Sequence, residues 1–215
     1  MRYLCSLALL TMACVSAALG VPRKHTVVLG RSRTVSAPDQ NGRTQSIKIR
    51  ELLVDGRLRE YTSGAPHEVT DRLFVIRRAR RINDSLPSET GQRVRWIWQL
   101  EGWISVDRTT GHVAQLNLPG FDPEISEANW YRDYAAYCGS SDDGSKMYMM
   151  VFQIGKRKPI LKREFAGAGE CPAPVWERNP SRVTFNAGGE KSTFAVRAHG
   201  AAPQAESNNE DEGPQ

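Results

Sequence analysis

Apolar and charged residues alternate on both sides of Asp55-Gly56, and this pattern constrains the fold more than any other feature of the sequence. The segments IKIRELLV and RLREYTSG flank the dipeptide. Such alternation is typical of a half-buried β-strand, whose successive side chains point to opposite faces of a sheet. Asp-Gly accepts the positive φ angles of a two-residue hairpin turn. The sequence therefore favours a β-hairpin over a helix at this position.

The same period of two recurs in RVRWIWQLEGWISVD. One face of this predicted strand is apolar and the other is polar; the apolar residues are Val94, Trp96, Trp98 and Leu100. This alternation predicts that the tryptophans belong to the core rather than to a binding surface. Further hairpin turns are expected around Gly111, Gly144 and Gly188.

Two segments are expected to depart from this strand pattern. RSRTVSAPDQNGRTQS, residues 31–46, is polar and rich in turn residues, which favours a loop. Asp122 before Pro123 is a favourable N-cap and first-turn pair for a short helix. We therefore expect nine or ten short strands in a mainly β, antiparallel single domain. It would be a meander, a sandwich or barrel-like, with one or two short helices.

Two segments, WISVDRTTGHVAQLNL and SSDDGSKMYMMVF, resemble strand-turn elements of bacterial β-propeller blades. This resemblance implies a small propeller-like array as an alternative fold. The turn glycines 56, 111, 144 and 188 are separated by 55, 33 and 44 residues. Because a propeller repeats at a regular period, this irregular spacing favours the meander or sandwich.

The first 20 residues have the pattern of a secretory signal peptide: Arg2, an apolar run over 4–15, and small residues up to Gly20. A lipoprotein anchored at Cys14 is the less favoured alternative. We expect one β-rich domain over 21–203 and a disordered acidic tail over 204–215. After signal removal no apolar run is long enough to span a bilayer. The expected location is periplasmic or secreted.

Two cysteines, Cys138 and Cys171, lie outside the predicted signal. A pair of cysteines in an exported protein favours a structural disulfide. The less favoured alternatives are a free buried thiol and a nucleophilic Cys138, which would need a base such as His112, oriented by Asp133. The alternative function is a secreted hydrolase with an unrecognised site, for which a polar cleft gathering His112, Asp133 and a second carboxylate would be the signature.

No motif in the sequence predicts a metal, a cofactor or a known catalytic site. Asp142 and Asp143 precede Gly144, but the positions where an EF-hand loop would place its other ligands hold Ser141, Gly139 and Met150. Aspartate before glycine is typical of a turn. The sequence leaves an enzymatic activity open and favours a non-enzymatic role.

Basic residues provide the main functional signal. Residues 21–203 hold 28 lysines and arginines against 20 acidic residues. The candidate contacts for an anionic partner are Arg77, Arg78, Arg80, Arg81, Lys156, Arg157 and Lys158. The partner expected is an anionic envelope polymer or a protein, whereas nucleic acid is not expected. The alternatives are that this is a merely solvated basic surface, or that the arginine run protects an edge strand from sheet-to-sheet association. The oligomeric state is left open.

Overall fold

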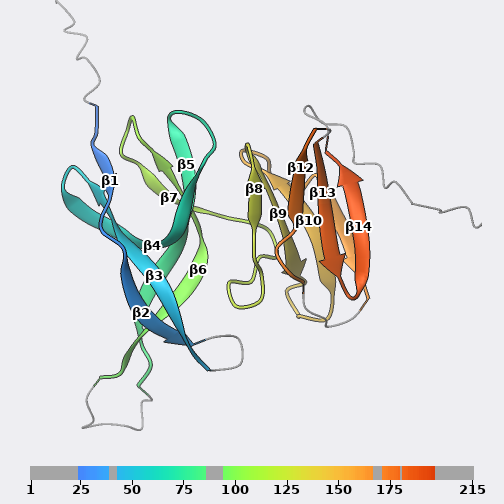
Figure 1. Cartoon of the computed structure of the whole chain (residues 1–215), viewed down its shortest axis with the longest axis horizontal. Coiled ribbons are helices and arrows are strands. Elements are labelled where there is room, and N and C mark those ends of the chain that lie inside the picture. The colour runs from blue at the N-terminus through green and yellow to red at the C-terminus, as the bar shows by residue number, and fades with distance from the viewer. Residues whose placement is uncertain (1–23, 39–42, 86–93, 167–170, 180, 197–215) are drawn as a thin grey trace, which may run out of the picture.

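The computed structural model describes residues 24–38, 43–85, 94–166, 171–179 and 181–196 (Figure 1). This part of the chain forms fourteen β-strands in three antiparallel sheets and contains no helix. The mainly β, antiparallel fold predicted from the sequence is confirmed.

The expected signal peptide (1–20) and acidic tail (204–215) lie outside the described residues. Within the described ranges, no helix is long and apolar enough to cross a membrane.

The first seven strands form one curved sheet, in the order β1-β3-β4-β5-β6-β7, with β2 also paired to β3 (Figure 1). These strands are β1 (Val27–Leu29), β2 (Arg33–Pro38), β3 (Thr44–Val54), β4 (Arg57–Glu68), β5 (Leu73–Asn83), β6 (Trp96–Asp107) and β7 (Val113–Leu116). The β3–β4 connection is the predicted hairpin, with φ of 52° at Asp55 and 74° at Gly56. Because the first seven strands share one sheet, they do not form the separate blades of a propeller.

The seven-stranded sheet curls until its two edges approach each other. Val27 of β1 and Val113 of β7 lie at opposite edges, yet both pack against the same apolar cluster. At Gly111, in the β6–β7 turn, φ is 65° and a Cβ atom would lie 2.7 Å from Val54 Cγ1 and 3.1 Å from His25 Cβ. Only glycine therefore fits where the edges meet.

The remaining strands form a four-stranded and a three-stranded sheet. The four-stranded sheet has the order β11-β10-β9-β8, and the three-stranded sheet has the order β12-β13-β14. Their bounds are β8 (Asn129–Tyr131), β9 (Tyr134–Ser140), β10 (Met147–Gln153), β11 (Leu161–Phe165), β12 (Val175–Arg178), β13 (Ser181–Ala187) and β14 (Glu190–Ala195).

The β9–β10 hairpin is buried on both faces, so the four-stranded sheet is the middle of three layers (Figure 1). One face packs through Ala136 and Val151 against Phe185 and Phe194 of the three-stranded sheet. The other face packs against the curved sheet, in a cluster that includes Tyr137, Met150, Phe152, Val75 and Trp103.

The predicted disulfide is present. Cys138 in β9, only 1% exposed, is bonded to Cys171, and their Cα atoms are 6.2 Å apart. The bond ties the middle sheet to the segment that leads into β12. A disulfide is compatible with an extracellular or periplasmic protein.

Three expectations about secondary structure were wrong: the number of strands, the loop over 31–46 and the short helix at Asp122. There are fourteen strands rather than nine or ten, and residues 33–38, expected as a loop, form β2. Strand β2 pairs with β3 and turns only two side chains, Val35 and Ala37, towards an apolar cluster, and the many turn-forming residues of 31–46 hid this short alternation.

The short helix expected at Asp122 is a single turn. Asp122 Oδ1 accepts the backbone N–H of Glu124, as an N-cap does, and its carbonyl accepts that of Ser126. The turn goes no further because the Ser126 hydroxyl donates to the Cys138 carbonyl, 2.6 Å away, and so fixes the chain against β9.

Removing the disulfide should destabilise the protein without changing its fold. For a separation of 33 residues, loop-closure entropy predicts that C138A/C171A loses roughly 3–4 kcal/mol of unfolding free energy. Urea unfolding of the variant, and of wild type with and without reductant, measures this. An unchanged midpoint would contradict the prediction, as would free thiols on both cysteines in unreduced protein.

Candidate binding surface

The arginine run lies in the second half of β5, between β4 and β6. Because β5 is an inner strand, the alternative that these arginines protect a sheet edge is wrong. Arg78 and Arg80 contact residues on one side of the sheet, and Arg77 and Arg81 contact residues on the other.

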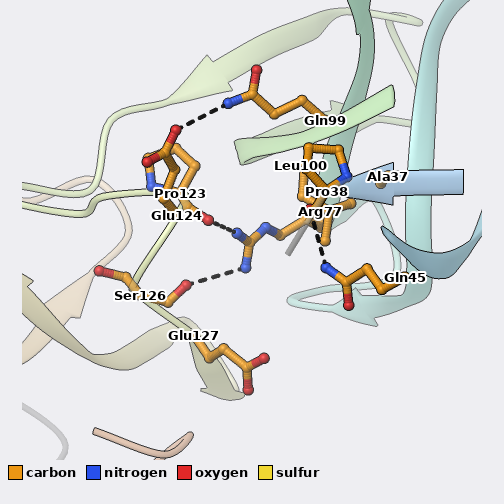
Figure 2. A pocket seen from close by; sticks show the side chains of 10 residues that line it. All are labelled: Ala37, Pro38, Gln45, Arg77, Gln99, Leu100, Pro123, Glu124, Ser126 and Glu127. Carbon is orange, nitrogen blue, oxygen red and sulfur yellow. Dashed lines mark hydrogen bonds between the residues drawn. The ribbon is translucent and has the colours of Figure 1, made fainter. Parts of the chain in front are cut away.

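Arg77 is largely buried and its guanidinium is used within the protein (Figure 2). Nε donates to the Glu101 carbonyl at 2.8 Å, Nη2 to the Pro123 carbonyl at 2.7 Å and Nη1 to the Ser126 carbonyl at 3.3 Å. Its guanidinium carbon lies 5.3 Å from the centre of the Phe121 ring. Burial lowers the pKa of Arg77. Arg77 therefore holds the segment that links the curved sheet to β8.

A cavity of about 260 Å³ lies beside Arg77 (Figure 2). Its lining includes the carboxylates of Glu124 and Glu127, and Glu124 accepts a 3.4 Å hydrogen bond from Gln99. Because the arginine already donates to three carbonyls and two acidic residues line the cavity, this pocket is poorly suited to an anion.

Glutamates form ion pairs with Arg78 and Arg80. Arg78 contacts Glu60 at 3.0 Å and Glu101 at 3.3 Å, with all three side chains about one-quarter exposed. Arg80 reaches the other oxygen of Glu101 at 3.5 Å, but its side chain is 61% exposed. Arg78 is thus neutralised, whereas Arg80 remains largely open to solvent.

Arg81 and Arg33 lie over aromatic rings instead of pairing with carboxylates. The guanidinium of Arg81 lies 5.2 Å from the ring centre of Trp96, and that of Arg33 lies 5.4 Å from both Tyr61 and Trp98. Tyr61 and Trp98 themselves make an edge-to-face pair at 5.0 Å. We call these five side chains the arginine–aromatic surface.

The arginine–aromatic surface leaves its cations available. No ion pair joins Arg33 or Arg81 to an acidic side chain in the part of the chain that the structure describes. A guanidinium stacked on a ring keeps its in-plane N–H donors free to bind oxyanions. Sequence reasoning missed Arg33, which was placed in a loop, and Trp96, which was assigned to the core.

The second predicted basic cluster is separate. Lys156, Arg157 and Lys158 are exposed in the β10–β11 turn, on the middle sheet. Among the described residues no aromatic ring supports them as rings support Arg33 and Arg81, which makes them the weaker candidates for contact with an anionic partner.

The structure does not bring the proposed nucleophile, base and orienting carboxylate together. The Cys138 sulfur is consumed by the disulfide. His112 lies in the β6–β7 turn, whereas Asp133 lies between β8 and β9 and accepts a 2.8 Å hydrogen bond from Gln153. No hydrogen bond or ion pair joins His112 to Asp133, and both residues are among those described.

Asp143 organises the β9–β10 turn. Its carboxylate accepts hydrogen bonds from the Ser141 hydroxyl and from the backbone and hydroxyl of Ser145. These bonds, with that from Ser141 the largest effect, lower the pKa of Asp143 to about 2. Across the described ranges, no group of three or more His, Cys, Asp or Glu side chains could hold a metal ion.

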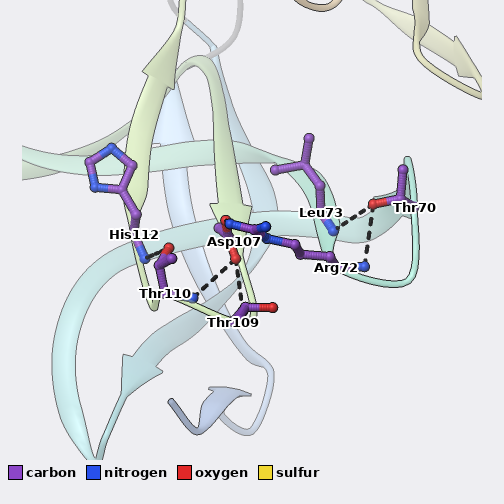
Figure 3. Close-up of polar contacts among 7 residues, drawn as sticks. All are labelled: Thr70, Arg72, Leu73, Asp107, Thr109, Thr110 and His112. Atoms are coloured by element: carbon purple, nitrogen blue, oxygen red, sulfur yellow. Dashed lines mark hydrogen bonds and ion pairs between the residues drawn. The ribbon is translucent and has the colours of Figure 1, made fainter. Parts of the chain in front are cut away.

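A second polar cluster closes the opposite end of the curved sheet (Figure 3). Asp107 accepts the backbone N–H groups of Thr109 and Thr110 at 2.8 and 3.1 Å, and Arg72 Nε donates to it at 2.8 Å. The Arg72 bond, aided by the two amides, holds the pKa of Asp107 far below its usual range. Because the carboxylate is engaged in this way, the cluster acts as a turn clamp.

Comparisons with protein-family models, curated proteins and solved structures find no match to this chain.

The same substitution should destabilise the protein at Arg77 but have little effect at Arg81. R77M leaves three carbonyls without their donor and should lower the unfolding free energy by about 2 kcal/mol or more. R81M, at an exposed position, should change it by less than about 0.5 kcal/mol. Urea unfolding of both variants measures this, and equal losses would contradict the assignment of a structural role to Arg77 alone.

The hydrogen bonds of Asp107 should make the stability of the protein depend on pH in the acid range. Since the pKa of Asp107 is lowered by folding, its contribution is fully present above the unfolded value of about 4 and decreases as pH falls below it. D107N should therefore be less stable than wild type at pH 7, and this difference should shrink towards pH 3. D142N, which alters an exposed aspartate of another turn, is the matched control. A difference for D107N that is independent of pH would refute the prediction.

Proposed function

We propose that this protein is an exported, non-enzymatic binding module that holds an anionic component of the cell envelope, or an anionic protein partner, on its curved sheet. The predicted signal peptide and the Cys138–Cys171 disulfide support a periplasmic or secreted location. The Arg33 and Arg81 guanidinium groups are the proposed contacts.

The observation that carries this proposal is the segregation of charge. Residues 24–118, which include the curved sheet, contain 16 lysines and arginines against 10 acidic residues, whereas residues 119–196 contain 10 of each. A basic excess concentrated on one sheet favours association with polyanions.

The arginine–aromatic surface supplies the local chemistry. Stacking on a ring orders the long arginine side chain before a ligand arrives, which reduces the entropy lost on binding. The free N–H edges suit carboxylate, phosphate and sulfate groups. Arg77 and Arg78 contribute charge to the sheet but no free donor edge of comparable exposure.

Retention on an anionic dextran sulfate matrix at low ionic strength tests the proposal. Wild type should be retained and elute in moderate salt, because screening weakens contacts between exposed charges. R33A/R81A should elute at clearly lower salt, and binding to soluble dextran sulfate should weaken about tenfold or more. K156A/R157A/K158A, which removes three exposed charges from the middle sheet, is the control and should elute close to wild type.

Two results would overturn the proposal. One is the failure of folded wild type to bind the matrix at low ionic strength. The other is equal loss of retention in R33A/R81A and the control variant, because binding would then depend on net charge rather than on the arginine–aromatic surface.

A further inference from the structure

The apolar face of β6 extends past the buried core towards the N-terminal end of the strand. Leu100 and Trp98 pack against the cluster formed by Ile47, Ile49 and Ala79. The next residues on the same face of the strand pattern are Trp96 and Val94, each 51% exposed. Trp96 pairs with Asn83 at the last described rung of the β5–β6 ladder.

Arginines surround this exposed end of the β5–β6 hairpin. Arg80 and Arg95 have side chains 61% and 64% exposed, and Arg81 lies over Trp96. Asp84, which contacts Arg95 at 2.6 Å, is the only acidic residue in the stretches 80–85 and 94–96. The exposed indole and valine therefore lie within a local excess of positive charge.

We propose that the surface around Trp96 docks on an anionic phospholipid surface, with Trp96 and Val94 entering the interfacial layer and Arg33 and Arg81 facing the lipid phosphates. The proposal rests on the proposed function and names the envelope component. At an anionic membrane, the arginine guanidinium faces the lipid phosphates while the apolar part of its side chain lies against the interfacial layer.

The combination of groups favours a bilayer over a soluble polyanion. A polymer would use the arginine edges but would leave Trp96 and Val94 in water, with no gain from their exposure. At a membrane interface the indole ring is apolar on its faces and polar at its N–H, which is why tryptophan is enriched there. Each arginine near an anionic surface adds about fivefold in affinity, so the docking is peripheral, reversible and sensitive to salt.

Vesicle binding by the full chain tests this inference. The protein should co-sediment with vesicles of equal parts phosphatidylglycerol and phosphatidylcholine, but not with phosphatidylcholine alone. Tryptophan emission should shift to the blue on binding and be quenched by brominated lipid. W96A should bind at least tenfold more weakly. V175A, which removes a valine of similar exposure (55%) from β12, is the control and should bind as wild type does.

The outcomes separate this inference from the proposed function. Retention on dextran sulfate without binding to phosphatidylglycerol vesicles overturns the membrane inference and leaves the proposed function intact. Equal binding to both vesicle types, or unchanged binding by W96A, also overturns it. Loss of vesicle binding and of dextran sulfate retention by folded wild type overturns both. The brominated-lipid measurement uses wild type, so it remains decisive if W96A fails to fold.

Discussion

Burial of both faces of the β9–β10 hairpin is the constraint on which the rest of the molecule depends. Ala136 and Val151 face the three-stranded sheet, while Tyr137 and Met150 face the curved sheet. A strand buried on both sides has a nearly continuous apolar sequence, as YAAYC and MYMMVF do. The disulfide then fixes one of the two interfaces covalently. Without this middle layer, the two outer sheets would each expose an apolar face.

The middle layer also determines which part of the curved sheet stays open. It covers the region around Val75 and Trp103, but the same face of the sheet extends further along β5 and β6. Among the described residues, β2 covers part of this region, with Ala37 packed into the cluster with Trp98 and Leu100, and the 123–127 segment lies against Gln99 and Leu100. Beyond this cover, Trp96 is half exposed and Arg81 lies over its ring. The open surface thus exists because the β5–β6 strand pair is longer than the elements that pack against its face.

Local signals predicted much of the fold, and long-range contacts account for what they missed. The hairpin at Asp55 and the disulfide followed from turn chemistry and cysteine count, which need no knowledge of the tertiary structure. Strand β2 was missed because its alternation is short, with only Val35 and Ala37 facing inward, and lies within a segment rich in turn residues. Alternation correctly gave the face on which Trp96 lies. It could not show that the core ends before reaching it, since that depends on the length of the covering layer.

The arginine run shows why a count of charges is a poor guide to a binding site. Four arginines within five residues experience three environments: Arg77 donates to buried carbonyls, Arg78 and Arg80 share glutamates, and Arg81 stacks on an indole. Carbonyl and glutamate partners lower the free energy of the unliganded protein, so an incoming anion must compete with them. A ring holds the guanidinium by a cation–π contact and does not occupy its N–H donors. The position best suited to bind an anion is therefore the arginine whose partner is aromatic, and Arg33, far away in sequence, meets the same condition.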